Sequence, residues 1–187
     1  PILSSVDISK VMEQYVKNYS NFQFLGPSPI DFDSKQMQGT CVSEELCNFN
    51  LEKFYNNKIN KIGIIFNLDP HWKGGSHWVC MYIDMNDINN GIISFYDSYG
   101  IEPGNEIQDL MSKFVSQGLS IEPNIILEPI YNPVQRQHKN SECGMYCLYF
   151  ITSLLEKKHN YDYFQEHEIP DKSMIRYRNI LFNRPSS

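Results

Sequence analysis

Two side chains in this sequence could together perform nucleophilic catalysis. Cys143 lies in the stretch 140–144 (NSECG), between a polar loop and the first turn of an expected apolar helix. The unpaired backbone N–H groups and the dipole at a helix N-terminus favour an anion, so they would stabilise a thiolate there. A thiolate nucleophile needs an imidazole nearby, and the imidazole needs a group that orients it. His77, which follows the loop 74–76 (GGS), is the candidate base, and Asp97 is the candidate orienting group.

The remaining cysteines have simpler explanations. Cys147 lies four residues after Cys143 among apolar side chains, which predicts a buried core residue. The five cysteines form no even framework, so we expect free thiols and a reducing compartment. The spacing of His71, His77, Cys80, Cys143 and Cys147 matches no zinc motif, and we expect no metal.

Apolar periodicity predicts the elements that must position these groups. We expect helices at about 7–19, 43–54, 105–117, 142–157, 161–168 and 171–182. We expect strands at 62–66, 78–85, 92–96 and 124–131, the last of a buried type, and loop or extended chain at 22–32. This order predicts an α+β protein. A mainly antiparallel central sheet is flanked by helices, with the nucleophile at the N-terminus of a central helix.

The two central strands are expected to form a hairpin that turns at 89–91 (NNG). His77 lies 13 residues before Asn90 and Asp97 lies 7 residues after it, so a tight turn would not place them opposite each other. A bulge, or a longer loop over 84–91, must absorb the difference. Both residues lie at strand ends towards the same edge of the sheet, where we expect the site.

The length of 187 residues predicts a single catalytic domain, 1–187, in which 1–21 form an N-terminal helical extension. The sequence begins at Pro1 without a Met, which suggests that upstream sequence is missing. It contains no signal peptide and no apolar stretch long enough to span a membrane. The net charge of −6 disfavours a nucleic-acid partner. We therefore expect an intracellular protein that binds neither nucleic acid nor membrane.

As a set, the motifs resemble the proteases of SUMO and other ubiquitin-like proteins, a superfamily that includes adenovirus protease. The resemblance rests on 75–78 (GSHW), 95–98 (FYDS), Gln137 and 142–144 (ECG), in the chain order His, Asp, Gln, Cys. The chain resembles still more closely the polyprotein-processing proteases of African swine fever virus and related large DNA viruses. That similarity extends to 83–85 (IDM) and to the C-terminal residues Ile169, Asp171, Met174, Arg178, Leu181 and Phe182.

The resemblance implies a role for each member of the set. Cys143 is the nucleophile, and His77 is the general base and then the general acid. Asp97 is the orienting carboxylate, as in the SUMO proteases, whereas the African swine fever enzyme carries Asn there. Gln137 supplies an oxyanion donor beside the backbone N–H of Cys143.

The resemblance also implies how substrate is bound. Trp78 forms one wall of a narrow tunnel that admits only Gly-Gly before the scissile bond, and we expect the other aromatic wall in the 24–32 segment. Gly144 leaves backbone room for substrate beside the nucleophile.

The implied function is a cysteine endopeptidase that cleaves after Gly-Gly-type motifs. It would process viral structural polyproteins during virion maturation, in the host cytoplasm or the virion, without a cofactor. One alternative is an isopeptidase that removes SUMO or ubiquitin from host conjugates. An acetyltransferase on the same fold would be expected to carry a basic cofactor site, and this acidic chain has no large one. A catalytically inactive binding homologue is disfavoured by the intact set of four residues.

Overall fold

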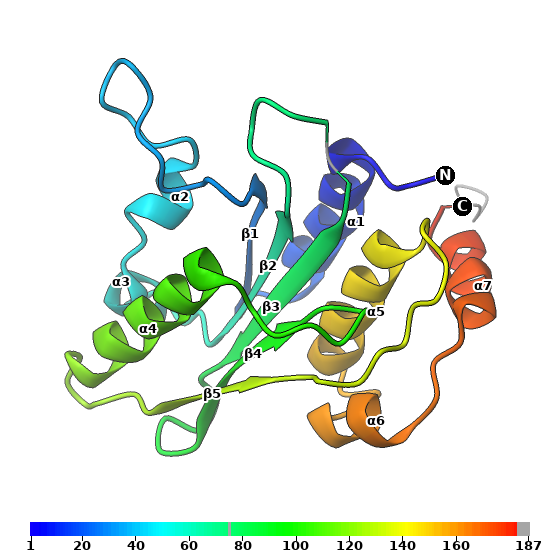
Figure 1. Cartoon of the computed structure of the whole chain (residues 1–187). Helices are drawn as coiled ribbons and strands as arrows, with labels where there is room; N and C mark the ends of the chain where they lie inside the picture. The colour runs from blue at the N-terminus through cyan, green and yellow to red at the C-terminus, as the bar shows by residue number, and fades with distance from the viewer. Residues whose placement is uncertain (75, 183–187) are drawn as a thin grey trace.

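The computed structural model describes residues 1–74 and 76–182, so Gly75 of the expected GSHW motif lies outside the described residues. Within them a five-stranded sheet lies in the middle of the molecule, with helices on both faces (Figure 1). The strands are β1 (Phe22–Pro29), β2 (Lys61–Asn67), β3 (Trp78–Asp84), β4 (Gly91–Tyr96) and β5 (Leu127–Tyr131). The helices are α1 (Ser5–Asn18), α2 (Glu44–Cys47), α3 (Leu51–Asn56), α4 (Asn105–Leu119), α5 (Cys143–Leu155), α6 (Tyr161–Glu166) and α7 (Asp171–Phe182).

The strands lie across the sheet in chain order. The central strands β2, β3 and β4 are antiparallel to their neighbours among themselves, as predicted. Both edge strands pair in parallel, β1 with β2 and β5 with β4. The predicted α+β class is confirmed. The parallel pairing of the two edge strands was not predicted. The segment expected to be loop or extended provides β1.

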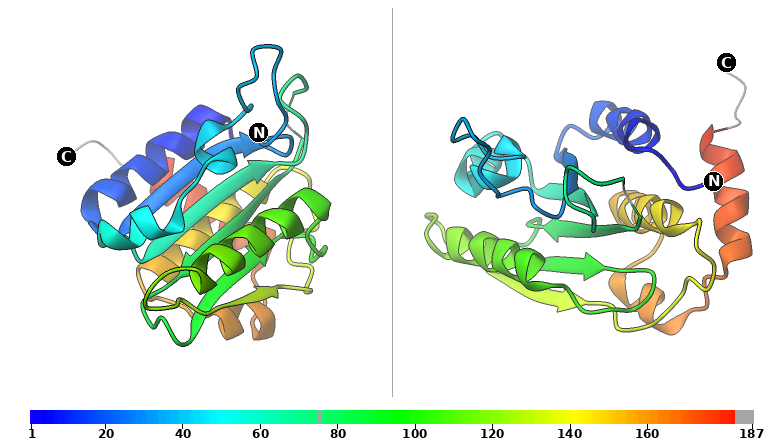
Figure 2. Two further views of the ribbon diagram at one scale, coloured as in Figure 1. Left: turned by 90° about the vertical axis from the view of Figure 1, so that its left-hand side faces the viewer. Right: turned by 45° about the horizontal axis from the view of Figure 1, so that its top comes forward.

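Helices cover both faces of the sheet and form two separate cores (Figure 2). One face packs against α1, α5 and α6, with α7 on the outside of α5, and the other face packs against α2, α3 and α4. Side chains of β3 alternate between them: Cys80 and Tyr82 join the core beside α5, while Met81 and Ile83 join the core beside α4. Because both faces are covered, β2 and β3 are apolar and buried almost throughout.

Helix α5 is the central helix of the fold. Twelve of its 13 residues are buried, so it has no polar face of the kind seen on a surface helix. Phe150 stacks on Tyr96 of β4 with ring centroids 4.5 Å apart. Gly63 of β2 permits the close approach of this helix, because a Cβ there would lie 3.1 Å from Ile151 Cγ2. The buried helix holds its N-terminal residue, Cys143, in a fixed place relative to the strand ends.

The loop between β3 and β4 is not a tight turn at 89–91; it is the longer loop over 84–91 that the sequence offered as an alternative. Asp84 pairs with Ile92, so six residues, 85–90, connect the two strands. The carboxylate of Asp87 accepts hydrogen bonds from the Asn89 backbone and the Asn90 side chain, which stabilises the longer loop. If the register of β3 and β4 is continued by one residue past Tyr96, position 79 lies opposite Asp97. His77 is therefore only two residues from the position opposite Asp97.

The predicted helix over 43–54 is wrong in one respect, because the structure has two short helices there. Asn48–Asn50 separate α2 from α3. The side chain of Asn50 accepts a hydrogen bond from the Lys53 backbone at 3.1 Å and so begins a new helix.

Two further boundaries also differ. β5 begins at Leu127 instead of Asn124 and is mostly exposed, because it is an edge strand and not a buried one. Helix α4 continues to Leu119, past the predicted end at Gly118.

The expectation of five free thiols is wrong for two cysteines. Cys41 and Cys47 form a disulfide with their Cα atoms 6.2 Å apart. The chain before α2 folds back, with a bridge between Lys35 and Cys41 and a 2.8 Å hydrogen bond from the Cys41 backbone to Glu44. A cysteine count cannot reveal this local return of the chain. Cys80, Cys143 and Cys147 are free and buried.

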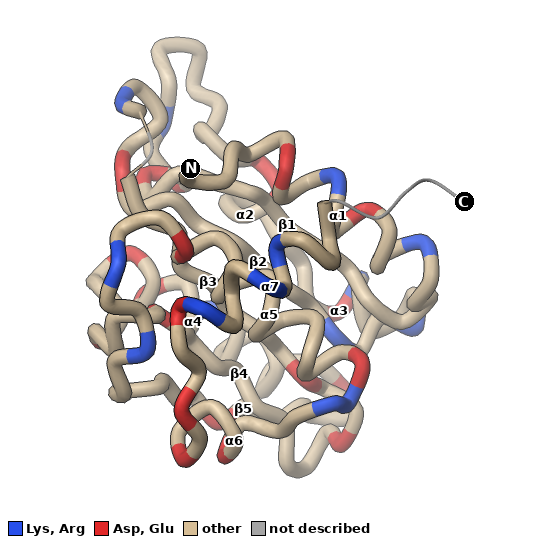
Figure 3. Tube along the Cα trace, turned by 90° about the vertical axis from the view of Figure 1, so that its right-hand side faces the viewer, with Lys and Arg blue, Asp and Glu red and all other residues tan. Residues whose placement is uncertain are grey.

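Basic and acidic residues are both scattered over the side of the molecule viewed in Figure 3. In residues 1–74 and 76–182, no helix has the length and apolar character needed to cross a membrane.

We predict that Phe150→Ala destabilises the protein by about 3–5 kcal/mol, because it removes the ring that packs α5 against β4. Ile180→Ala, at a residue that is 48% exposed, is the control and should cost less than about 0.5 kcal/mol. Urea unfolding followed by circular dichroism measures both. Similar losses for the two variants would contradict the central position of α5.

Candidate active site

The structure brings three of the predicted residues to one end of the sheet. His77 directly precedes β3, Asp97 directly follows β4, and Cys143 is the first residue of α5. His77 Nε2 donates a hydrogen bond to Asp97 Oδ1 at 2.8 Å. The two side chains are 12% and 3% exposed, so water screens this contact only weakly. Asp97 Oδ1 is itself held in place by the Tyr99 backbone N–H at 2.9 Å.

The surroundings of His77 favour its protonated form. Burial alone lowers the pKa of His77, but its hydrogen bonds with Asp97 and Cys143 and the charges of these groups outweigh burial and raise the pKa to about 9. Because Nε2 faces Asp97, Nδ1 is the ring atom left for the Cys143 thiol. The ring of Tyr99 stacks on the imidazole with centroids 4.6 Å apart and limits its rotation.

Cys143 and Cys147 lie in different environments on the same helix. Cys143 is 1% exposed and occupies the first position of α5, where the backbone N–H groups of the first turn have no helical partner. Cys147 lies inside the core, and burial together with Cys80 raises its pKa well above the ordinary value. Cys147 therefore stays a neutral thiol, which agrees with its predicted place in the core.

Gln137 is fully buried, and its side-chain amide is held from both ends. Ser98 Oγ donates to Gln137 Oε1 at 2.6 Å, and Gln137 Nε2 donates to the carbonyl of Lys139. The Gln137 backbone N–H also donates to the Ser98 carbonyl at 2.8 Å. Since Nε2 carries two hydrogens and Lys139 takes one, a second donor remains for another acceptor.

The loop around Gln137 is held against the body of the protein by Arg136. This buried side chain donates to the carbonyls of Phe164 and Gln165 in the last turn of α6 at 2.7–3.1 Å. A cation at a helix C-terminus is stabilised by the unpaired carbonyls there, so the contact supports both elements.

Trp78 and Gly144 also lie together, and they meet a residue from the start of the chain. The Trp78 indole Nε1 donates to the carbonyl of Leu3 at 2.9 Å. A Cβ on Gly144 would lie 3.1 Å from Leu3 Cδ1 and 3.2 Å from Trp78 Cδ1. Leu3 and Trp78 therefore cover the backbone next to Cys143 closely. Part of the 24–32 segment, in which the second wall was expected, lines the same cleft as Leu3 and Trp78 at Pro27, Ser28 and Pro29.

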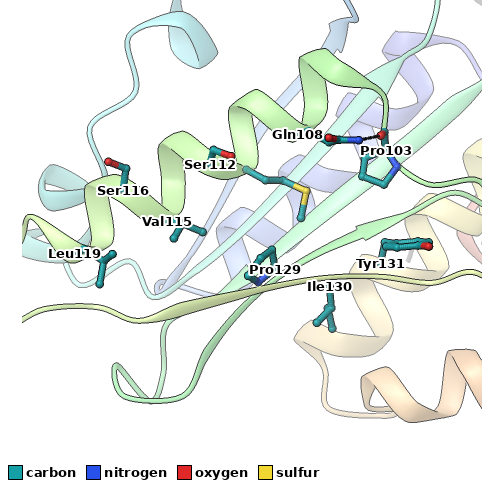
Figure 4. Close-up of a pocket in the computed structure, with 10 residues that line it drawn as sticks. Pro103, Gln108, Ser112, Val115, Ser116, Leu119, Pro129, Ile130 and Tyr131 are labelled. Atoms are coloured by element: carbon teal, nitrogen blue, oxygen red, sulfur yellow. Dashed lines mark hydrogen bonds between the residues drawn. The ribbon is translucent and has the colours of Figure 1, made fainter.

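Two open depressions on the described surface differ in their relation to the site: one includes Trp78 and the other does not. A cleft of about 540 Å³ begins at Leu3 and Trp78 and continues along 27–29 and 67–73. An apolar groove of about 510 Å³ lies between α4 and β5 (Figure 4). None of the predicted site residues lines this groove. Its lining consists of Pro103, Gln108, Met111, Ser112, Val115, Ser116, Leu119, Pro129, Ile130 and Tyr131. The position of the titratable residues, and not the size of a hollow, therefore identifies the site.

His71 pairs with Asp31 in a loop, and His159 and His167 stack on the ring of Tyr163. Across 1–74 and 76–182, no three His, Cys, Asp or Glu side chains are arranged to hold a metal ion.

Three residues with contacts in the site were missed by sequence reasoning. Ser98 stood in the FYDS motif, but only its contact with Gln137 gives it a function. Tyr99 follows Asp97 directly, and an aromatic residue there carries no signal of its own. Leu3 lies 75 positions from Trp78, so no local pattern could pair them.

Comparison with known proteins supports the same chemistry. Residues 8–184 match the Ulp1 protease family, C-terminal catalytic domain. The chain is 35% identical over 185 residues to a thiol protease of Acanthamoeba polyphaga mimivirus, covering 98% of this chain and 58% of that protein. It is 26% identical over 188 residues to a cysteine protease of African swine fever virus, covering 97% of this chain and 67% of the other.

Solved structures agree on the fold. The crystal structure of the African swine fever virus protease pS273R superposes with a TM-score of 0.82 at 22% identity, covering 99% of this chain and 68% of that one. The C-terminal Ulp1 protease domain in complex with Smt3, the yeast orthologue of SUMO, superposes with a TM-score of 0.63 at 19% identity. That match covers 96% of this chain and 74% of the other.

The fold and the site together define a cysteine-peptidase domain. More particularly, the chain belongs to the Ulp1 protease family, and it corresponds to the C-terminal catalytic domain of that family. The predicted resemblance is thereby confirmed. The chain spans 58% of the length of its mimivirus relative and 67% of that of the African swine fever virus relative.

We predict that Asp97→Asn lowers the pKa of His77. The variant loses the carboxylate charge, which together with Cys143 raises this pKa to about 9, whereas the burial that lowers it remains. The imidazolium should therefore lose its proton at a lower pH than in the parent. NMR titration of the His77 ring signal, assigned with His77→Asn, measures the midpoint. Asp109→Asn, on the exposed side of α4, is the control; an unchanged midpoint in Asp97→Asn would show that Asp97 does not govern this proton.

Proposed function

We propose that this domain hydrolyses peptide bonds after Gly-Gly-type motifs, with Cys143 as nucleophile, His77 as base and acid, and Asp97 as the orienting carboxylate. The observation that carries the proposal is the 2.8 Å contact of His77 with Asp97, combined with the raised pKa that His77 owes partly to Cys143. An imidazole held in this way accepts the thiol proton when Cys143 acts as nucleophile, which gives an imidazolium and a thiolate.

The first half of the reaction forms a thioester. The Cys143 thiolate attacks the carbonyl carbon of the scissile bond, and the carbonyl oxygen becomes an oxyanion. The free Nε2–H of Gln137 and the backbone N–H of Cys143 stabilise that oxyanion; loss of one such donor typically costs about 10²–10³ in rate. The His77 imidazolium then donates its proton to the leaving amine as the C–N bond breaks.

The second half returns the enzyme to its starting state. Neutral His77 takes a proton from water, and the hydroxide attacks the thioester carbonyl. The C–S bond breaks, the carboxylic acid product leaves, and the thiolate pairs again with the imidazolium. Asp97 holds the ring in one orientation through both halves. The sequence of steps uses only side chains, backbone amides and water.

The narrow space beside Cys143 supports selectivity for glycine. Leu3 and Trp78 pack closely over the Gly144 backbone, because a Cβ placed on Gly144 would lie only 3.1–3.2 Å from their nearest side-chain atoms. Leu3, Trp78 and Cys143 are all buried, so a substrate must displace part of this cover, and a residue without a side chain requires the smallest displacement. The cleft of about 540 Å³ that begins at Leu3 and Trp78 offers an extended peptide a path away from the scissile bond.

We further propose that the substrate is a viral structural polyprotein and that the reaction takes place in the host cytoplasm or the virion. Relatives in a mimivirus and in African swine fever virus support a viral source, and these two are named thiol and cysteine protease. A second candidate function is the removal of SUMO or ubiquitin from host conjugates. It is favoured by other African swine fever virus relatives, which are named SUMO-1 cysteine protease.

We predict that Cys143→Ala lowers kcat for peptide cleavage by at least about 10³-fold, because no nucleophile replaces the thiolate. Cys147→Ala is the matched control on the same helix and should keep most of the activity. Circular dichroism should give similar folded signals for both variants. Loss of activity in Cys147→Ala alone would mean that the nucleophile is misassigned.

We predict that a fluorogenic Gly-Gly-X peptide is cleaved at least about 100-fold faster, as kcat/KM, than its Ala-Gly-X and Gly-Ala-X counterparts, since a methyl group must fit under Leu3 and Trp78. Ubiquitin and SUMO carrying C-terminal fluorophores are assayed beside the peptides. Preference for either conjugate over Gly-Gly-X would favour the isopeptidase function. Activity on none of these substrates would contradict the proposed function.

A further inference from the structure

We propose that Asp171 and Arg178 are positioning residues for the two oxyanion donors, the Gln137 amide and the Cys143 backbone N–H. The inference rests on the function proposed above and adds α7 to its machinery. The two residues are seven positions apart on α7, which is close to two helical turns, so they lie on the same face. α7 packs beside α5, and the side of the molecule that carries both is seen in Figure 3.

Asp171 holds the segment that follows Gln137. Its Oδ2 accepts hydrogen bonds from the backbone N–H groups of His138 and Lys139 at 3.2 and 3.1 Å. The carbonyl of Lys139 in turn accepts from Gln137 Nε2. Asp171 therefore fixes the residue that orients the Gln137 amide, and it does so from outside the site.

Arg178 holds the residues just before the nucleophile. Its Nη2 donates to the Ser141 carbonyl at 3.2 Å and to both carboxylate oxygens of Glu142 at 3.2 and 3.3 Å. Glu142 is the N-cap of α5, and its carbonyl accepts the backbone N–H of Tyr146 at 3.0 Å. The 142–143 peptide, whose N–H belongs to Cys143, is thus held between α7 and the first turn of α5.

Partial burial makes the Arg178–Glu142 contact stronger than a surface ion pair. The two side chains are 18% and 7% exposed, so solvent screens the charges incompletely. At the Asp171 end, the hydroxyl of Tyr146 lies 3.0 Å from Oδ1. Burial and the contact with Asp171 raise the pKa of Tyr146, so its hydroxyl stays protonated; Asp171 shares this donor with the carbonyls of Ile169 and Arg136, at 2.8 and 3.2 Å.

One helix therefore sets the positions of both donors. An oxyanion hole stabilises the transition state only when its donors point to where the charge develops, and a small displacement has a large effect. Neither Asp171 nor Arg178 lines the cleft that begins at Leu3 and Trp78. Their loss should consequently change the chemical step and leave substrate binding nearly intact.

The test compares Asp171→Asn and Arg178→Gln with the parent, using a Gly-Gly-X peptide. We expect kcat to fall by about 10- to 100-fold with KM changed by less than about threefold. Asp162→Asn, in the exposed first turn of α6, controls for loss of a helix-terminal carboxylate. Arg176→Gln, on the exposed side of α7, controls for loss of charge.

A double-mutant cycle separates positioning from simple support of the fold. If Asp171 acts through Gln137, Asp171→Asn should lower kcat by less than about threefold in a Gln137→Ala background. The rate at which iodoacetamide labels Cys143, followed by mass spectrometry, should stay within about twofold of the parent, because labelling needs the thiolate and no oxyanion donor. An unfolded variant would lose the selectivity for Cys143, because unfolding would expose Cys80 and Cys147 to iodoacetamide as well.

Arg178→Lys provides a further measurement and keeps the role testable if Asp171→Asn does not fold. Lysine keeps the charge but loses the planar set of donors, so kcat should lie between those of the parent and Arg178→Gln. Unchanged kcat in Arg178→Gln, or a full additive loss in the Gln137→Ala background, would overturn the positioning role. If the parent cleaves no Gly-Gly peptide, the proposed function itself fails, and the role of α7 falls with it.

Discussion

The burial of α5 is the constraint on which the rest of this structure depends. Strands contact it on one side, and α1 and α7 contact it on others. Because twelve of its residues are buried, sliding or tilting the helix would expose apolar surface or open cavities, and both are costly. The helix N-terminus thereby keeps a fixed distance from the ends of β3 and β4. A nucleophile and a base from segments far apart in the chain can meet only because that distance is fixed.

Burial of the helix creates a second requirement, because polar groups gathered at its N-terminus have lost most of their water. Each is satisfied by a specific partner: His77 by Asp97, Gln137 by Ser98 and Lys139, and Glu142 by Arg178. Such a network is stable only when most of its donors and acceptors are paired, and the second Nε2–H of Gln137 is left for the substrate. The pairing also orients them, so the same contacts that make burial tolerable prepare the site for catalysis. The raised pKa of His77 is one consequence.

The sequence predicted those parts of the molecule that local patterns determine. The positions of His77 and Cys143 followed from a strand end and a helix N-terminus, and the periodicity of the apolar residues indicated most of the helices and the central strands. What it could not supply depends on contacts between distant segments. Leu3 meets Trp78 across 75 positions, and Ser98 meets Gln137 across 39. The Asn-Gly signal indicated the hairpin but not its register, because Asp87 stabilises the longer loop that the spacing of His77 and Asp97 had offered as an alternative.

The most direct test of the central claim is covalent capture of the nucleophile by a substrate-like electrophile. A peptide ending in Gly-Gly-vinyl methyl ester places its reactive carbon where the scissile carbonyl would lie, and mass spectrometry after digestion identifies the modified residue. The account predicts a single adduct on Cys143, which is lost in His77→Ala and much reduced for the Gly-Ala probe. An adduct on Cys147 or Cys80, or none on folded protein, would contradict it.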